Sequence, residues 1–172
     1  MRRCQCSMFN VQWSMFNRQC SMVNRQSIKN NTMKLSEHFQ IKEFERSATA
    51  QRMGIDNRVP DALIPNLQAL CQHVLEPLRQ QFNEPVFISS GYRCPALNSC
   101  VKGAKKSQHM KGEAADIYSR QGSKRLREWY LWMVDNLHFD QLIWETRANG
   151  SKWIHVSYKR TGGNRQQVLR GS

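Results

Sequence analysis

The first 26 residues repeat with a period of seven, in the units 5–11, 12–18 and 19–25, and the repeat ends before Met33. It places Met beside Phe or Val and lacks the Glu and Lys pairs that flank the seam of a coiled coil. We therefore interpret residues 1–32 as a low-complexity segment that is disordered, or as translated sequence upstream of a true start at Met33. The remaining 140 residues can build one ordinary domain with its own core.

The chain is strongly basic, with 26 Lys and Arg, 13 Asp and Glu, and a formal net charge of +13. Residues 1–32 hold five of the basic groups and no acidic one, so the remainder still carries +8. Such a surface suits an anionic partner or serves solubility alone, and charge does not choose between these. No helix-turn-helix, zinc-finger or RNA-recognition signature accompanies the charge, so nucleic acid is not an expected partner.

The sequence has no apolar run of about 20 residues, which is the length that a membrane span needs. Its N-terminus also lacks the apolar segment and cleavage site of a secretory signal, so we expect the chain to be cytoplasmic at synthesis. We also expect it to be a monomer. The six cysteines form no CxxC pair, which argues against a zinc site made of cysteines.

Hydrophobic spacing predicts helices first and a small sheet afterwards. A long amphipathic helix is expected to begin with Asp61 as its N-cap and to kink or restart at Pro77. Further helices are expected over residues 44–53 and 123–137, strands over 86–89, 113–118, 139–145 and 153–158, and a loop over 94–108. The last two strands form a hairpin, and residues 161–172 are expected to be a frayed tail. This order predicts one α+β domain over residues 33–160, with a mainly antiparallel sheet flanked by helices.

Two histidines and an aspartate stand out as candidate metal ligands. A catalytic zinc site uses three protein ligands and leaves a fourth position open, and His109, Asp116 and His155 would supply such a set. Gly112 can turn the chain between His109 and Asp116, and alternation along the last strand directs His155 away from the more apolar face. Spacing alone leaves open that His155 is an ordinary hydrogen-bonded strand residue.

A resemblance to a known family narrows this choice. The unbroken pattern SxHxxGxAxD, here Ser107, His109, Gly112, Ala114 and Asp116, resembles the M15 family of zinc D-Ala-D-Ala peptidases. The similarity extends from about residue 35 to 158 and is closest to the M15A-like branch of bacteria and their phages. It implies a fold like that of hedgehog and the DD-peptidases, with one zinc ion per chain bound by His109, Asp116 and His155.

The same resemblance implies roles for three further residues. Arg93, in the motif Gly-Tyr-Arg, would steady the oxygen of the scissile carbonyl, although it could also be a surface cation. Ser107 would donate a hydrogen bond either to the substrate or to a metal ligand, and Tyr92 would contact the substrate.

The usual general base is missing, because Lys152 occupies the position three before the last histidine where many relatives have an acid. We expect Glu145 to replace it. If residues 146–152 form the hairpin loop, Ile143 lies opposite His155 and Glu145 lies diagonal to it on the same face. Glu113 is a weaker rival, and Glu145 could also be a solvated residue at the strand end.

The resemblance implies a zinc peptidase that cleaves peptidoglycan stem peptides, as a D-Ala-D-Ala carboxypeptidase or as an endopeptidase. A phage or prophage lysis enzyme would fit this description. The alternative is a non-catalytic, zinc-containing module that binds the cell wall.

Overall fold

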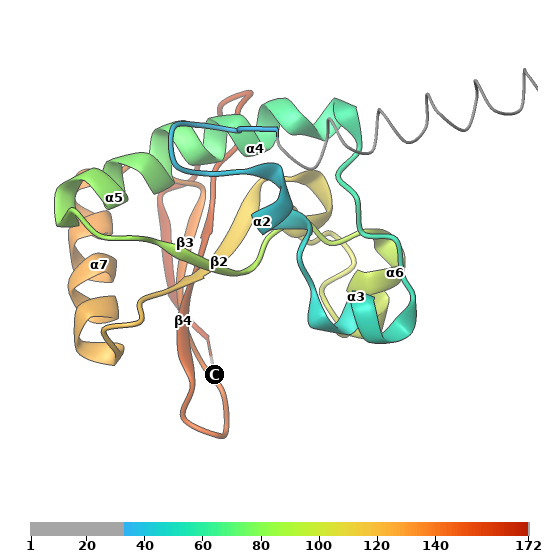
Figure 1. Cartoon of the computed structure of the whole chain (residues 1–172). Coiled ribbons are helices and arrows are strands. Elements are labelled where there is room, and N and C mark those ends of the chain that lie inside the picture. Colours follow the sequence, from blue (N-terminus) through green and yellow to red (C-terminus); the bar gives the residue numbers. More distant parts are fainter. Residues whose placement is uncertain (1–32, 172) are drawn as a thin grey trace, which may run out of the picture. The chain divides into compact units, whose positions relative to one another are not determined.

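The structure is a computed structural model, and it describes residues 33–171 (Figure 1). The prediction about residues 1–32 lies outside the described part of the chain. Within residues 33–171, no helix is both long enough and apolar enough to cross a lipid bilayer.

Five strands form one sheet in the order β1, β2, β4, β3, β5. Their bounds are β1 Phe87–Ser90, β2 Ala114–Tyr118, β3 Gln141–Thr146, β4 Lys152–Ser157 and β5 Gln167–Arg170. All neighbouring strands are antiparallel except β3 and β5, which are parallel. Together with the helices around it, this sheet confirms the predicted α+β class.

The helices precede the sheet in sequence, apart from those between its strands. They are α2 Ile41–Glu45, α3 Ala48–Met53, α4 Ile64–Leu70, α5 Glu76–Phe82, α6 Pro95–Cys100 and α7 Ser123–Asn136, with 3-10 turns at Asp61–Leu63 and Gln108–Lys111. The helix expected over residues 44–53 is thus two short helices, and Gly54 ends the second with a φ of 63°. The loop expected over residues 94–108 contains α6, which begins at Pro95.

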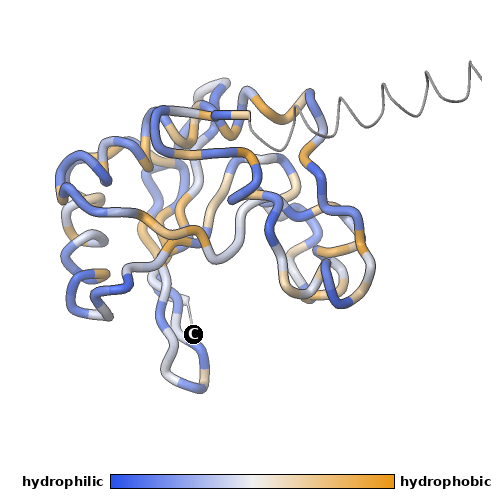
Figure 2. The backbone as a smooth tube through the Cα atoms, viewed as in Figure 1, coloured by the Kyte–Doolittle hydropathy of each residue, from blue (hydrophilic) through white to orange (hydrophobic). Residues whose placement is uncertain are grey.

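The core lies between one face of the sheet and helices α4, α5 and α7. Alternate residues of β2 and β4, namely Ala115, Ile117, Ile154 and Val156, share a buried cluster with Leu67, Leu70, Val74 and Leu78 of the helices. Figure 2 shows hydrophobic residues gathered where the central strands meet these helices. These three helices do not cover the opposite face of the sheet.

The long amphipathic segment does not begin as predicted. Pro60 occupies the N-cap position and Asp61 lies in the first 3-10 turn, so the expected capping by Asp61 is wrong. A π turn over Cys71–Leu75 joins α4 to α5 just before Pro77. Since proline has no N–H to donate, a local change of helical pitch lets the segment continue past it.

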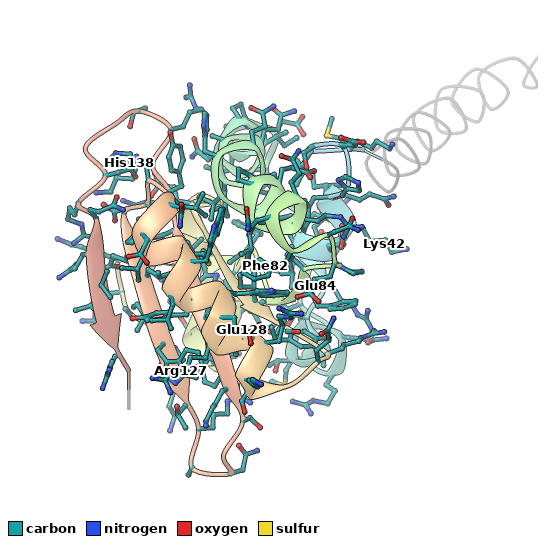
Figure 3. All side chains as sticks on the ribbon, turned by 90° about the vertical axis from the view of Figure 1, so that its left-hand side faces the viewer. Lys42, Phe82, Glu84, Arg127, Glu128 and His138 are labelled. Atoms are coloured by element: carbon teal, nitrogen blue, oxygen red, sulfur yellow. The ribbon has the colours of Figure 1, made fainter. Side chains whose placement is uncertain are left out.

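Helix α7 is anchored to the segment after α5 through a partly buried carboxylate. Glu84 accepts a 2.7 Å hydrogen bond from Nε1 of Trp129 and lies 3.3 Å from Nε of Arg125. The Arg125 guanidinium lies above the ring of Phe82, which Figure 3 labels beside Glu84. These contacts fix the helix that covers the sheet.

The prediction of a frayed tail from residue 161 onward is wrong for the part that the structure describes. Residues Gln167–Arg170 form β5, which pairs with Gln141–Trp144 of β3. The tail is held because Asp140, fully buried, accepts hydrogen bonds from Arg165 and lies 2.8 Å from Nζ of Lys159. The sequence did not predict that Asp140 pairs with Lys159 and Arg165, because these residues lie far apart in the chain.

Candidate metal centre

The face of the sheet away from the core carries the two strand residues of the candidate site. Asp116 of β2 lies directly opposite His155 of β4 in the antiparallel register. The predicted alternation is confirmed, because Ala115 and Ile117 are in the core while Asp116 points to the other face.

The third candidate ligand, His109, reaches the same point from the 3-10 turn before β2. Its Nε2 lies 3.2 Å from Nδ1 of His155 and 3.3 Å from Oδ1 of Asp116, and the last two atoms are 2.9 Å apart. Ligands bound tetrahedrally at zinc distances of about 2.0–2.2 Å are about 3.3 Å from one another. The three side chains therefore form a group that can hold a metal ion.

The ring of His109 is fixed by the backbone of the segment before α6. Its Nδ1 lies 2.6 Å from the carbonyl oxygen of Gly91, which can only accept, so Nδ1 carries the proton and Nε2 is free to bind a metal. Burial lowers the pKa of His109, so its imidazole is neutral at pH 7. A neutral imidazole is the form that ligates metal ions.

The turn that carries His109 depends on Gly112. This residue has a φ of 65°, and a Cβ there would lie 3.2 Å from the carbonyl oxygen of Leu63, in the 3-10 turn before α4. Asn66 of α4 also donates to the carbonyl of Lys111 at 2.9 Å. The glycine in the sequence pattern therefore permits both the turn and its close approach to the helix.

Asp116 divides its two oxygens between the histidines and an arginine. Oδ1 lies near His155 and His109, while Oδ2 accepts a 2.6 Å hydrogen bond from Nη2 of Arg93. Burial by itself raises the pKa of Asp116, but contacts with His109 and His155 outweigh burial and hold the pKa below its ordinary value. The carboxylate is thus ionised, as a metal ligand must be.

Two clefts meet at this group. The first, of about 610 Å³, is the histidine cleft, and its lining includes Ser107, His109, Glu145 and His155. The second, of about 800 Å³, is the hydroxyl cleft, and its lining includes Ser47, Thr49, Ser89, Ser119 and Ser151. Arg93, Asp116 and Trp153 line both, so the candidate metal centre lies where one cleft passes into the other.

The hairpin geometry predicted for Glu145 is confirmed. Ile143 pairs with His155 and Glu145 pairs with Trp153, so Glu145 is diagonal to His155 on the same face. Glu145 lines the histidine cleft, whereas Lys152 lines the hydroxyl cleft. Glu113 also lines the histidine cleft, and its Oε2 is buried without a hydrogen-bond partner among the described residues.

Tyr92 does not lie where the sequence placed it. Its side chain belongs to the hydrophobic core, the residue is only 5% exposed, and it lines neither cleft. The predicted contact of Tyr92 with substrate is therefore wrong, because in this irregular segment Tyr92 packs into the core while Arg93 lines the clefts. Ser107, by contrast, lines the histidine cleft as expected.

Asp140 is a residue of the site region that sequence reasoning missed. Beyond Arg165 and Lys159, it accepts a 3.0 Å hydrogen bond from Nε2 of Gln108, the neighbour of His109. Burial raises the pKa of Asp140, but hydrogen bonds from Arg165 and Lys159 outweigh burial and hold the pKa well below its ordinary value. The sequence offered one sign of a buried role for Asp140. It is a charged residue that follows Phe139 at the start of a largely apolar strand.

A pair of histidines and one carboxylate at the floor of an open cleft is typical of mononuclear metal-dependent hydrolases. The family model described as Peptidase M15 matches residues 37–157, and the chain belongs to this family of peptidases. No curated protein matches the chain. The narrower M15A-like assignment stays a prediction.

Proposed function

We propose that the protein is a zinc-dependent peptidase that hydrolyses peptide bonds in peptidoglycan stem peptides, of the D-Ala-D-Ala carboxypeptidase or endopeptidase type. The observation that carries the proposal is the triangle of His109 Nε2, Asp116 Oδ1 and His155 Nδ1, with sides of 2.9–3.3 Å, between two clefts. Membership of the Peptidase M15 family supports the choice of reaction.

His109, Asp116 and His155 would hold one zinc ion per chain. When bound, the ion supplies the Lewis acidity that polarises a carbonyl and makes water a nucleophile near pH 7. The chain's own residues bind the peptide, stabilise charge and move protons.

Arg93 is the proposed donor to the oxygen of the scissile carbonyl. Its Nε donates to Oγ of Ser90 at 2.9 Å and its Nη2 donates to Asp116, which fixes the plane of the guanidinium. Nη1 has no hydrogen-bond partner among the described residues, so its two N–H groups can donate to the substrate. A positioned donor of this kind stabilises the negative charge that grows on the oxygen during attack.

Glu145 is the proposed general base. From its place in the histidine cleft, its carboxylate would take the proton of the attacking water and return it to the leaving amine. Ser107, in the same cleft, would donate a hydrogen bond to the substrate backbone. The +8 charge beyond residue 32 favours an anionic wall as the site of action, and phage or prophage lysis is the setting we propose.

Digestion of purified peptidoglycan, followed by mass spectrometry of the released peptides, tests this function. The zinc-loaded protein should release peptides, and their termini identify the bond that is cut. The Glu145→Gln variant should release peptides far more slowly than the wild type. Retention of the protein on peptidoglycan without cleavage would instead support the non-catalytic wall-binding module.

A further inference from the structure

Three cations without ion-pair partners line the hydroxyl cleft. Arg46, Arg147 and Lys152 are all exposed, and none of them forms an ion pair or side-chain hydrogen bond with any residue in the range 33–171. The only carboxylate among the lining residues is Asp116, which is already bonded to Arg93. This half of the site therefore has an excess of positive charge.

The tertiary structure brings these cations together from two separate places in the chain. Arg46 follows α2, while Arg147 and Lys152 flank the turn between β3 and β4. The Arg147 guanidinium lies 5.1 Å from the centre of the Trp153 ring, which also lines both clefts. This stacking restrains Arg147 beside the passage to the metal centre.

The local backbone adds to the positive potential. Gly122 and Ser123, at the start of α7, also line the hydroxyl cleft. The first turn of this helix contains no acidic residue, and no side chain caps it. Its N-terminal N–H groups thus add a partial positive charge to that of the three cations.

We infer that the hydroxyl cleft binds the free carboxylate of an acidic residue next to the scissile bond, so that the enzyme prefers peptides in which this carboxylate is free to their amidated forms. Clustered cations without counter-charges attract an anion, and arginine pairs with carboxylate through two parallel hydrogen bonds. Because the cleft is continuous with the metal centre through Arg93, Asp116 and Trp153, one short peptide can span both. This inference rests on the proposed peptidase activity.

The test compares two stem peptides that differ only in whether the carboxylates of their acidic residues are free or amidated. We expect kcat/KM to be higher for the acidic peptide. In Arg147→Gln and Arg46→Gln, the ratio of kcat/KM between the acidic and the amidated peptide should fall about tenfold, as one charge-assisted hydrogen bond partly screened by water would give. Both residues are exposed, so the variants should fold, which circular dichroism checks.

The matched control is Arg127→Gln. Arg127 is an exposed arginine of α7 that lines neither cleft, and Figure 3 labels it on the outer side of that helix. The control should keep the wild-type ratio. An unchanged ratio in both cleft variants would overturn the inference. An equal fall in all three variants would also overturn it, because the preference would then come from the overall surface charge, as for a long polyanion.

Failure of the proposed function looks different from failure of this inference. If the zinc-loaded wild type hydrolyses neither peptide, the peptidase proposal fails, and calorimetric titration of the wild type and of Arg147→Gln with the same two peptides still tests the cleft. Tighter binding of the acidic peptide that is lost in Arg147→Gln would then support carboxylate binding. Equal affinities for the two peptides would refute it.

Discussion

Nη2 of Arg93 donates a 2.6 Å hydrogen bond to Oδ2 of Asp116, while Oδ1 of the same carboxylate lies 2.9 Å from Nδ1 of His155. One carboxylate thus orients both a candidate ligand and a candidate donor to the substrate. Because each oxygen has its own partner, the carboxylate cannot rotate without breaking one of these contacts. Metal binding and substrate polarisation are therefore expected to depend on each other.

Removal of one candidate ligand should abolish metal binding. We expect about one zinc ion per wild-type chain and none in His155→Ala, since two protein ligands are too few for a stable site. Zinc at 100 times its dissociation constant should add about 2.7 kcal/mol to the free energy of unfolding of the wild type. Metal analysis and thermal melts with and without zinc measure both effects.

The control is His138→Ala, which changes an exposed histidine outside both clefts (Figure 3). Wild-type zinc content in His155→Ala would refute the assignment.

Replacement of Arg93 by lysine should impair catalysis even though the charge is kept. An ammonium group cannot donate to Ser90 and Asp116 and also reach the substrate in one fixed plane. We expect kcat to fall by about 10²–10³, as for the loss of one donor to a developing oxyanion. Steady-state kinetics measures this, with Arg127→Lys as the control. A near-normal kcat in Arg93→Lys would show that Arg93 only supports the fold.

The Glu145→Gln variant should bind zinc normally and turn over slowly. Because the amide cannot accept a proton from water, kcat should fall by about 10²–10⁴. Metal analysis and kinetics on the same preparation separate the two properties, and Glu37→Gln, at an exposed position outside both clefts, is the control. If turnover is normal, the role passes to Glu113, and Glu113→Gln becomes the next variant to measure.

Loss of the Asp140 charge should destabilise the protein in a pH-dependent way. Since its pKa is lowered in the folded state, the stabilisation is fully present above the unfolded-state pKa of about 3.9 and is lost as the pH falls toward the folded-state value. At pH 7, Asp140→Asn should lower the free energy of unfolding by on the order of 2 kcal/mol. This is less than the roughly 3–5 kcal/mol of a fully buried pair, because Lys159 and Arg165 remain partly exposed.

Urea denaturation of the wild type and of Asp140→Asn at several pH values checks this prediction. The difference between the two proteins should be constant from pH 7 to about pH 5 and should shrink below about pH 4. A difference that does not change with pH would mean that the effect comes from packing instead of charge.

Deletion of residues 1–32 should leave the domain unchanged. The heptad repeat lacks the pattern of a coiled coil, and the hydrophobic spacing typical of a folded domain begins only after Met33. The melting temperature and turnover of the full chain and of a chain that begins at Met33 are the quantities to compare. A large loss in either quantity would show that the repeat is part of the working protein.

The local features of this protein could be predicted from its sequence, because they depend on residues close together in the chain. Apolar spacing located the buried face of α4 and α5, and strand alternation placed Asp116 and His155 opposite the core. The hairpin register that sets Glu145 diagonal to His155 also followed from loop length. Tyr92 was misplaced because adjacent residues of an irregular segment have no fixed alternation.

Only the tertiary structure decided which distant residues meet. The pairing of β5 with β3, the burial of Asp140 among Gln108, Lys159 and Arg165, and the approach of Arg46 to the hairpin turn all join parts of the chain that no local pattern relates. Such contacts form because the packed sheet and helices bring the backbone into place, and the side chains then find partners there. For this reason the three candidate metal ligands could be predicted from the sequence, whereas the charge of the cleft beside them could not.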